Sequence, residues 1–228
     1  NVLITGANKG IGLETARQLL KQGWHVIVSG RDEIKLAEAV KGLKAESGEV
    51  EMVLMDVSSF ESVKAAAADL AQRKIQLDVL INNAGILLRT DRSLLSHDDE
   101  ILKTTINTNS YGPLRVVHAF LPMMKSPGRI INLSSEGGSM SEPLGGWSPA
   151  YCVSKTMLNA ITRHLAYELK EKDISVNAVC PGWVKSDMGG KSAPRSLEEG
   201  AETIVWAATE ARQNLTGKFF KNKAEIRW

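Results

Sequence analysis

A tyrosine and a lysine four residues apart, Tyr151 and Lys155, have the types and spacing needed for acid–base chemistry. The sequence around them predicts a helix from about Ala150 to Lys170, and residues four apart lie on one face of a helix. A free phenol has a pKa of about 10, too high for proton transfer at neutral pH. A nearby ammonium favours the phenolate and lowers this pKa. The pair is therefore a candidate general acid–base centre.

A glycine-rich segment, Thr5 to Gly12, lies between an apolar run that predicts a strand and a pattern that predicts a helix. Glycines allow positive φ angles and let backbone N–H groups approach a phosphate closely. The N-terminus of the following helix adds a partial positive charge. The spacing is G-x3-G-x-G rather than G-x-G-x-x-G, but its strand–turn–helix context favours a pyrophosphate site over a simple connecting turn.

The second predicted strand ends at Ser29-Gly30-Arg31-Asp32, about 20 residues beyond the glycines, where a dinucleotide's adenine ribose is expected. Gly30 offers no carboxylate to hold a 2′-hydroxyl, whereas Arg31 offers a guanidinium for a 2′-phosphate. Lys9 could reach the same phosphate. We therefore expect NADP(H) rather than NAD(H). Asp32 keeps the alternative open, because its carboxylate could face the ribose instead.

Polar and small residues also follow the later predicted strands. Asp56 follows the third strand, where it could accept a hydrogen bond from the adenine amino group, although it could also cap the next helix. Asn82 to Gly85 follow the fourth strand, and their small side chains allow close contact with a cofactor. Ser135 follows the fifth strand, where its hydroxyl could bind a substrate carbonyl, and Asn109 lies in the preceding helical stretch.

These residues must be positioned by an alternating series of strands and helices. The strand-like runs are apolar throughout, which indicates a parallel sheet buried on both faces by helices. The order predicts one doubly wound α/β domain over residues 1–228, with a cofactor half of about 1–130 and a catalytic and substrate half of about 131–228. Seven parallel strands are expected, at 2–4, 25–28, 50–55, 79–81, 129–133, 174–179 and 218–221.

Composition excludes several classes of function. The net charge of +2 is too small to indicate a nucleic-acid partner, and no apolar run approaches the roughly 18 residues of a membrane span. Two cysteines, Cys152 and Cys180, are too few for a secreted disulfide scaffold and suggest reduced thiols in a cytoplasmic protein. The four histidines show no metal-binding spacing, so no metal is expected.

Taken together, the motifs resemble those of the short-chain dehydrogenase/reductase family. The resemblance rests on TGANKGIG at 5–12, NNAG at 82–85, Asn109, Ser135, Tyr151-x3-Lys155 and PGWVKSDM at 181–188. These occur in family order and spacing across essentially the whole chain. The NKGIG loop, the GRD after the second strand and TGKFF at 216–220 are similar to NADPH-dependent members of the carbonyl-reductase type.

The resemblance implies an oxidoreductase that transfers a hydride between NADP(H) and an aldehyde or ketone. It implies that Tyr151 is the general acid in reduction and the general base in oxidation. Lys155 would lower the tyrosine pKa and bind the nicotinamide ribose. Ser135, preferred over Ser134 by register, would orient the carbonyl, and Asn109 would support a proton-relaying water.

Further contacts follow from the same comparison. The implied cofactor-binding residues are Gly6, Asn8, Lys9, Gly10, Ile11, Gly12, Arg31, Asp56, Val57, Asn83, Ala84, Gly85, Tyr151, Lys155, Pro181, Gly182, Val184 and Ser186. The expected substrate pocket consists of Ser135, Trp147, Trp183 and Met188, with the segment 142–147 lining or covering it.

Three alternatives remain open at this stage. The same scaffold could reduce a ketoacyl thioester, or it could be a non-catalytic NADP sensor. A Ser–Lys hydrolase pair is less consistent, because it leaves the glycine loop unexplained and no G-x-S-x-G motif is present. Fifteen residues separate Ser135 from Tyr151, without the long helical insertion of some monomeric carbonyl reductases, which leaves a homodimer or homotetramer possible.

Overall fold

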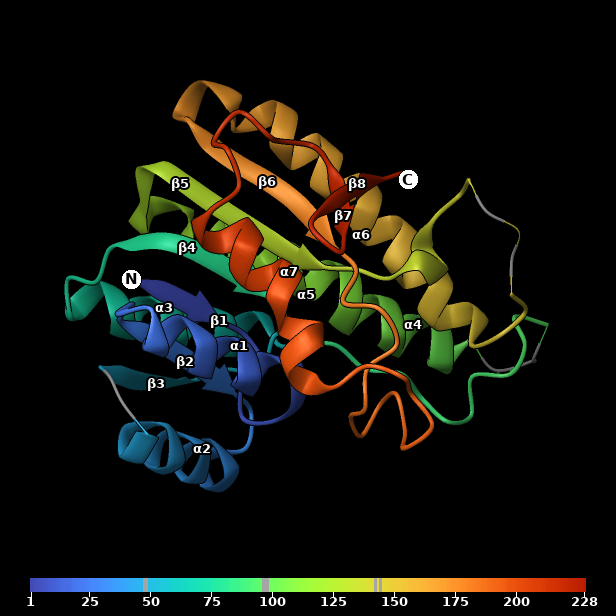
Figure 1. The fold of residues 1–228 in the computed structure, drawn as a ribbon, viewed down its shortest axis with the longest axis horizontal. Helices are drawn as coiled ribbons and strands as arrows, with labels where there is room; N and C mark the ends of the chain where they lie inside the picture. Colours follow the sequence, from blue (N-terminus) through green and yellow to red (C-terminus); the bar gives the residue numbers. More distant parts are fainter. Residues whose placement is uncertain (47–48, 96–98, 142, 144) are drawn as a thin grey trace.

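The computed structural model describes residues 1–46, 49–95, 99–141, 143 and 145–228, and it shows one sheet covered by helices (Figure 1). The strands are β1 (Val2–Ile4), β2 (Val26–Gly30), β3 (Val50–Leu54), β4 (Leu77–Asn82), β5 (Met124–Leu133), β6 (Ile174–Val179), β7 (Phe219–Lys221) and β8 (Ala224–Ile226). Their order in the sheet is β3-β2-β1-β4-β5-β6-β7-β8.

The helices alternate with these strands up to β7, as expected for a doubly wound fold. They are α1 (Gly10–Lys21), α2 (Glu33–Glu46), α3 (Phe60–Gln72), α4 (Glu100–Ile106), α5 (Gly112–Phe120), α6 (Pro149–Glu168) and α7 (Leu197–Thr209). Between α4 and α5 the chain forms one π-helical turn, Asn107–Tyr111. Short 3₁₀ turns lie at Leu121–Met123, Glu136–Gly138 and Lys170–Lys172. The fold class predicted from the sequence is confirmed.

The number of strands was predicted wrongly. The first seven strands are parallel, but β8 pairs antiparallel with β7 as an eighth strand. The two strands are joined by Asn222 and Lys223, which have φ angles of +52° and +60°. A two-residue loop with both φ angles positive is typical of a β-hairpin. Sequence patterns indicate this hairpin only weakly, because Lys223 replaces the usual glycine and β8 is partly exposed, without an apolar run.

Alternate residues of the central strands divide the core into two layers. Val2 and Ile4 pack with the apolar residues of α1, α2 and α7, whereas Leu3 packs with those of α3, α5 and α6. Side chains of a strand point alternately to the two faces of a sheet, so both faces of β1 are buried. Figure 1 shows the resulting three layers of helix, sheet and helix.

The strand order reverses direction beside β1. From β1 the chain adds β2 and β3 on one side, then crosses to β4 and continues outward on the other side, so β1 pairs in parallel with both β2 and β4. The chain after β1 and the chain after β4 therefore lead to helices on opposite faces of the sheet, α1 on one and α5 on the other. Ligands of open α/β sheets bind in the crevice formed at such a reversal.

The loop after β5 lies directly against the second turn of α6. A Cβ atom on Gly138 would be 2.6 Å from the carbonyl carbon of Lys155 and 2.8 Å from the backbone nitrogen of Thr156. Both of these neighbours are backbone atoms, which cannot rotate away. Glycine at this position therefore allows the loop carrying Ser135 to approach the helix carrying Tyr151 and Lys155.

We expect Gly138→Ala to destabilise the protein, because the added methyl group must displace backbone. Overpacking of this kind costs about 1–3 kcal/mol, to be measured by urea unfolding. Gly42→Ala is the matched control. It lies in α2 with no atom within 4 Å of the added Cβ, so the better helix propensity of alanine should stabilise the fold by roughly 1 kcal/mol. Equal effects of the two substitutions would contradict the packing argument.

Candidate active site

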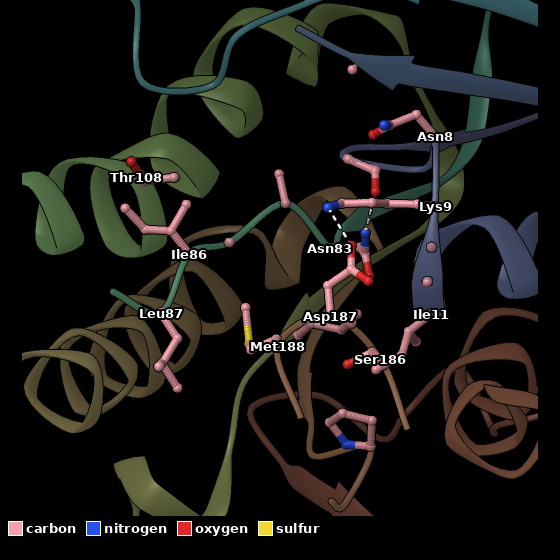
Figure 2. A pocket seen from close by; sticks show the side chains of 18 of the residues that line it. Asn8, Lys9, Ile11, Asn83, Ile86, Leu87, Thr108, Ser186, Asp187 and Met188 are labelled. Atoms are coloured by element: carbon pink, nitrogen blue, oxygen red, sulfur yellow. Dashed lines mark hydrogen bonds and ion pairs between the residues drawn. The ribbon is translucent and has the colours of Figure 1, made fainter. Parts of the chain in front are cut away.

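A cavity of about 1100 Å³ opens at the carboxyl edge of the sheet, beside the strand reversal. It brings together the carboxyl ends of six strands, β1 to β6, and Figure 2 shows side chains from several of them facing it. The predicted cofactor residues that line it are Gly6, Asn8, Lys9, Gly10, Ile11, Gly12, Arg31, Asp56, Val57, Asn83, Ala84, Gly85, Tyr151, Lys155, Pro181 and Ser186. A volume of this size is large enough for a dinucleotide.

The glycine loop after β1 packs against the turn after β4. Gly6 has a φ angle of +62°, and a Cβ there would be 2.8 Å from the Cα of Ala84. A Cβ on Gly12 would be 2.4 Å from the amide nitrogen of Asn83. The hydroxyl of Thr5 accepts hydrogen bonds from the backbone N–H groups of Asn83 and Ala84, at 3.0 and 2.9 Å. Sequence reasoning assigned Thr5 no role, although it opens the glycine motif.

The N-terminus of α1 is suited to an anion. No side chain caps the helix, and its first turn contains no acidic residue. Its first backbone N–H groups belong to Gly10, Ile11 and Gly12, which all line the cavity. Uncapped N–H groups and the positive end of the helix dipole favour a bound phosphate. This part of the cavity therefore fits the pyrophosphate of a dinucleotide.

Arg31 and Asp32, both expected near the adenine ribose, differ in whether their side chains face the cavity. The carboxylate of Asp32 accepts a hydrogen bond from the backbone N–H of Lys35 at 3.1 Å and forms an ion pair with the Lys35 ammonium at 2.8 Å. It is thus engaged at the start of α2 and is absent from the cavity lining. Arg31 lines the cavity. This arrangement favours a 2′-phosphate over a 2′-hydroxyl.

Lys9 lies beside the same region, but it already has an acidic partner. Its ammonium forms an ion pair with Asp187 at 2.7 Å, and both side chains are largely exposed. The pair joins the loop after β1 to the loop after β6 across the cavity (Figure 2). Exposed ion pairs contribute little free energy, so a phosphate could replace Asp187 as the partner of Lys9.

Asp56 also lines the cavity, at the end of β3. One carboxylate oxygen accepts hydrogen bonds from the backbone N–H and the hydroxyl of Ser58, at 2.9 and 2.6 Å. The cap of α3 is Ser59, whose hydroxyl accepts from the N–H of Ser62. Asp56 is therefore not the helix cap, and adenine recognition stays a prediction for it.

Tyr151 and Lys155 lie in the first two turns of α6, on the side facing the cavity. The ammonium of Lys155 is 5.6 Å from the centre of the tyrosine ring and donates a hydrogen bond to the carbonyl of Leu133 at 2.7 Å. The hydroxyl of Ser134 donates to the amide oxygen of Asn159 at 2.6 Å, and the hydroxyl of Ser135 accepts from the N–H of Gly137 at 3.1 Å. Ser135 is close enough to the phenol to lower its pKa, whereas of the two serines only Ser134 lines the cavity. The preference for Ser135 over Ser134 stays a prediction.

Burial shifts the pKa values of both groups toward their neutral forms. Desolvation raises the pKa of Tyr151 well above its usual value, and the hydrogen bond from Ser135 opposes the shift. Desolvation lowers the pKa of Lys155 to about 8. Lys155 was expected to lower the pKa of Tyr151. In the structure the pKa is raised instead, because the effect of burial is the largest. Strong shifts of two neighbouring groups in a cavity are typical of an active site.

Asn109 is held rigidly within the π-helical turn. Its amide accepts from the backbone N–H of Ile86 and donates to the carbonyl of the same residue, both at 2.8 Å. It also donates to the hydroxyl of Ser154 at 3.0 Å. These bonds join the loop after β4 to α6. Its role in a water relay stays a prediction.

Six predicted site residues lie outside the cavity lining: Asn109, Ser135, Trp147, Gly182, Trp183 and Val184. Val184 is buried against α7, and Gly182 faces the side chain of Arg195. Trp183 is 57% exposed and donates its indole N–H to the carbonyl of Gly189 at 2.8 Å.

Trp147 lies near the catalytic group, although it does not line the cavity itself. Its ring centre is 5.8 Å from that of Tyr151. Met188 does line the cavity and is shown in Figure 2. Glu142 and Leu144, part of the segment expected to cover the pocket, are outside the described residues.

The described part of the chain contains no cluster of three or more His, Cys, Asp or Glu residues that could hold a metal ion. His97 lies outside the described residues. Within the described residues, no helix is long and apolar enough to cross a membrane.

Comparisons with known proteins agree with this geometry. A family model described as short chain dehydrogenase matches residues 1–216. The chain is 32% identical to carbonyl reductase (NADPH) 1 of Sus scrofa, covering 99% of this chain and 93% of that protein. It is 34% identical to (+)-neomenthol dehydrogenase of Arabidopsis thaliana, covering 97% and 95%.

A solved structure shows the same likeness in three dimensions. The NADPH-bound carbonyl reductase from chicken fatty liver superposes with a TM-score of 0.90 at 30% identity, covering 100% of this chain and 98% of that one. The family model covers nearly the whole chain, and residues of the glycine loop, the NNAG turn, the Tyr151–Lys155 pair and the loop after β6 line one cavity. The chain therefore belongs to the short-chain dehydrogenase family.

Proposed function

We propose that this protein is an NADPH-dependent reductase of aldehydes or ketones. One observation carries the proposal: Tyr151 and Lys155, one helical turn apart, share a cavity with the glycine loop and Arg31. A phosphate-binding end and an acid–base end thus lie in one cavity. The relatives named as NADPH carbonyl reductases support the same reaction.

The residues of the chain would act as follows. Ser135 donates a hydrogen bond to the substrate carbonyl oxygen and so fixes it beside Tyr151. NADPH, held by the loops after β1 and β2, supplies the hydride. As negative charge develops on the oxygen, the phenol of Tyr151 donates its proton. The Lys155 ammonium, held by the Leu133 carbonyl, stabilises the phenolate that forms.

The two halves of the chain divide this work. Residues 1–130 supply the glycine loop, Arg31 and Asp56 to the cavity, and residues 131–228 supply Tyr151, Lys155 and the loop after β6, with Ser135 proposed beside them. Gly182 and Val184 are proposed to support the nicotinamide side indirectly, by shaping the loop after β6. Met188 lines the cavity and is proposed to contact the substrate there. Trp147 and Trp183 lie outside the lining and are proposed to surround the substrate at the cavity entrance.

The assembly, location and substrate of the protein stay predictions. Reduction of a ketoacyl thioester and a purely sensory role are not favoured, because the relatives are named as reductases and dehydrogenases. A homodimer or homotetramer is proposed from the missing insertion between Ser135 and Tyr151. The two free cysteines are consistent with a cytoplasmic location. Rates of NADPH oxidation across aldehydes, ketones, quinones and ketoacyl thioesters would identify the substrate class.

We expect Tyr151→Phe to lose most turnover, because the substitution removes the proton donor and keeps the ring. General acid catalysis contributes about 10²–10⁴-fold, so kcat should fall within that range. NADPH binding, followed by cofactor fluorescence, should change little. Tyr167→Phe is the matched control, since Tyr167 lies on the outer face of α6 and is 83% exposed. Turnover near the wild-type rate in Tyr151→Phe would exclude the proposed acid.

Arg31→Ala should reduce the preference for NADPH. Loss of a charge-assisted hydrogen bond costs about 1.5–3 kcal/mol, which corresponds to a roughly 10- to 100-fold lower kcat/KM with NADPH. The value with NADH should change little, because NADH lacks the 2′-phosphate. Lys41→Ala, an exposed cation of α2 outside the cavity, controls for general charge loss. An equal decrease with both cofactors would refute recognition of the 2′-phosphate by Arg31.

The buried Lys155 should reduce stability at neutral pH. In the folded protein its pKa is lowered to about 8, from 10.5. Between these values the unfolded chain binds more protons, so the stability of the folded state rises with pH across this window. The shift corresponds to about 3 kcal/mol of destabilisation below pH 8.

Lys155→Met removes this pH dependence. Its free energy of unfolding, relative to wild type, should therefore decline by about 2 kcal/mol between about pH 7 and about pH 9.5. Denaturant unfolding at a series of pH values measures this difference. Lys172→Met, at an exposed position, should differ from wild type by a constant amount. A constant difference for Lys155→Met as well would show that the lysine titrates normally.

A further inference from the structure

The helix that carries Tyr151 begins without a local cap. The residue before it, Ser148, has a φ angle of +41°, and its side chain makes no capping hydrogen bond. A serine that caps a helix has an extended backbone conformation, which directs its hydroxyl to the N–H groups of the first turn. The positive φ angle of Ser148 does not provide this geometry. Pro149 then occupies the first helical position and has no N–H to satisfy. The next two N–H groups, of Ala150 and Tyr151, need another acceptor.

That acceptor is Asp91, about 60 residues earlier in the chain. One carboxylate oxygen accepts from the N–H of Ala150 at 3.0 Å and the other from the N–H of Tyr151 at 2.9 Å. The Asp91 residue is only 4% exposed, and Ala150 and Tyr151 are also buried. A buried carboxylate at this position also interacts favourably with the positive end of the α6 dipole.

Asp91 lies in the loop that follows β4 and the Asn83 turn. Its own N–H donates to the carbonyl of Leu88 at 3.0 Å, and Leu88 lines the cavity. Earlier in the same loop, Ile86 exchanges two hydrogen bonds with Asn109. The loop is thus held at both ends, and Asp91 joins it to the backbone of the proposed proton donor itself.

We propose that Asp91 is a positioning residue for catalysis, which fixes the first turn of α6 so that the Tyr151 phenol meets the substrate carbonyl. The proposal rests on the function proposed above. The hydrogen bonds from Ala150 and Tyr151 to Asp91 fix the backbone of Tyr151 against the loop after β4. An earlier part of that loop lines the cofactor cavity. Geometric errors of about 1 Å at a reacting group can cost about 100-fold in rate.

Two substitutions of Asp91 weaken its hydrogen bonds to α6 to different degrees. Asp91→Asn keeps the size and one acceptor, but it places an amide donor against one of the two N–H groups. Asp91→Ala removes both acceptors. The matched control is Ser148→Ala, at the position where a local cap would lie, because the Ser148 hydroxyl makes no capping bond. It should behave like wild type.

The decisive measurement is single-turnover reduction of a good aldehyde or ketone by enzyme preloaded with NADPH. Partial unfolding lowers the amplitude of this reaction, because fewer molecules react, but leaves its rate constant unchanged. Displacement of Tyr151 lowers the rate constant itself. We expect a decrease of at least about 10-fold in Asp91→Ala and a smaller one in Asp91→Asn, with NADPH affinity within about threefold of wild type.

The proposal is overturned if both Asp91 variants keep the wild-type rate constant and lose only amplitude or thermal stability. It is also overturned if Asp91→Asn no longer binds NADPH, because the residue would then serve the fold as a whole. Tyr151→Phe, run in the same assay, tests the underlying function separately. Full activity in that variant would refute the proposed acid, whatever the Asp91 variants show.

Discussion

The close contact between the loops after β1 and β4 is the constraint on which the site depends. Gly6 and Gly12 leave no space for a Cβ atom beside Ala84 and Asn83. The hydroxyl and carbonyl of Thr5 bind the same turn at three points. This contact lies where the strand order reverses. The contact places the N-terminus of α1 at one end of the cavity. From the same contact, the loop after β4 continues to Asp91, which reaches α6 at the other end.

The catalytic helix is attached to that segment through polar contacts. Besides the carboxylate of Asp91, Asn109 binds the hydroxyl of Ser154, and Ser110 donates to the Ser154 carbonyl at 2.8 Å. All three contacts are buried and directional. Apolar packing alone would allow α6 to slide, whereas hydrogen bonds at fixed distances define where Tyr151 lies relative to the cofactor loops.

Burial gives the site its chemistry and also destabilises it. The phenol and the ammonium are both removed from water, so each is shifted toward its neutral form. The same low dielectric strengthens every interaction with charge that develops during reaction. The groups that offset the burial are specific ones, Ser135 for the phenol and the Leu133 carbonyl for the ammonium.

The sequence by itself determined the fold class, the seven parallel strands and most of the cavity lining. These follow from local signals, since buried strands are apolar throughout and glycines, Tyr151 and Lys155 have fixed spacings. The structure decided which partner each polar side chain takes. It engaged Asp32 with Lys35, three residues later in the chain. It also brought distant partners together, turning Ser134 to Asn159 and pairing Lys9 with Asp187. It added β8 through a hairpin without the usual glycine and placed Asp91 at the start of α6. A carboxylate cannot be assigned to an N–H group about 60 residues away until folding brings the two together.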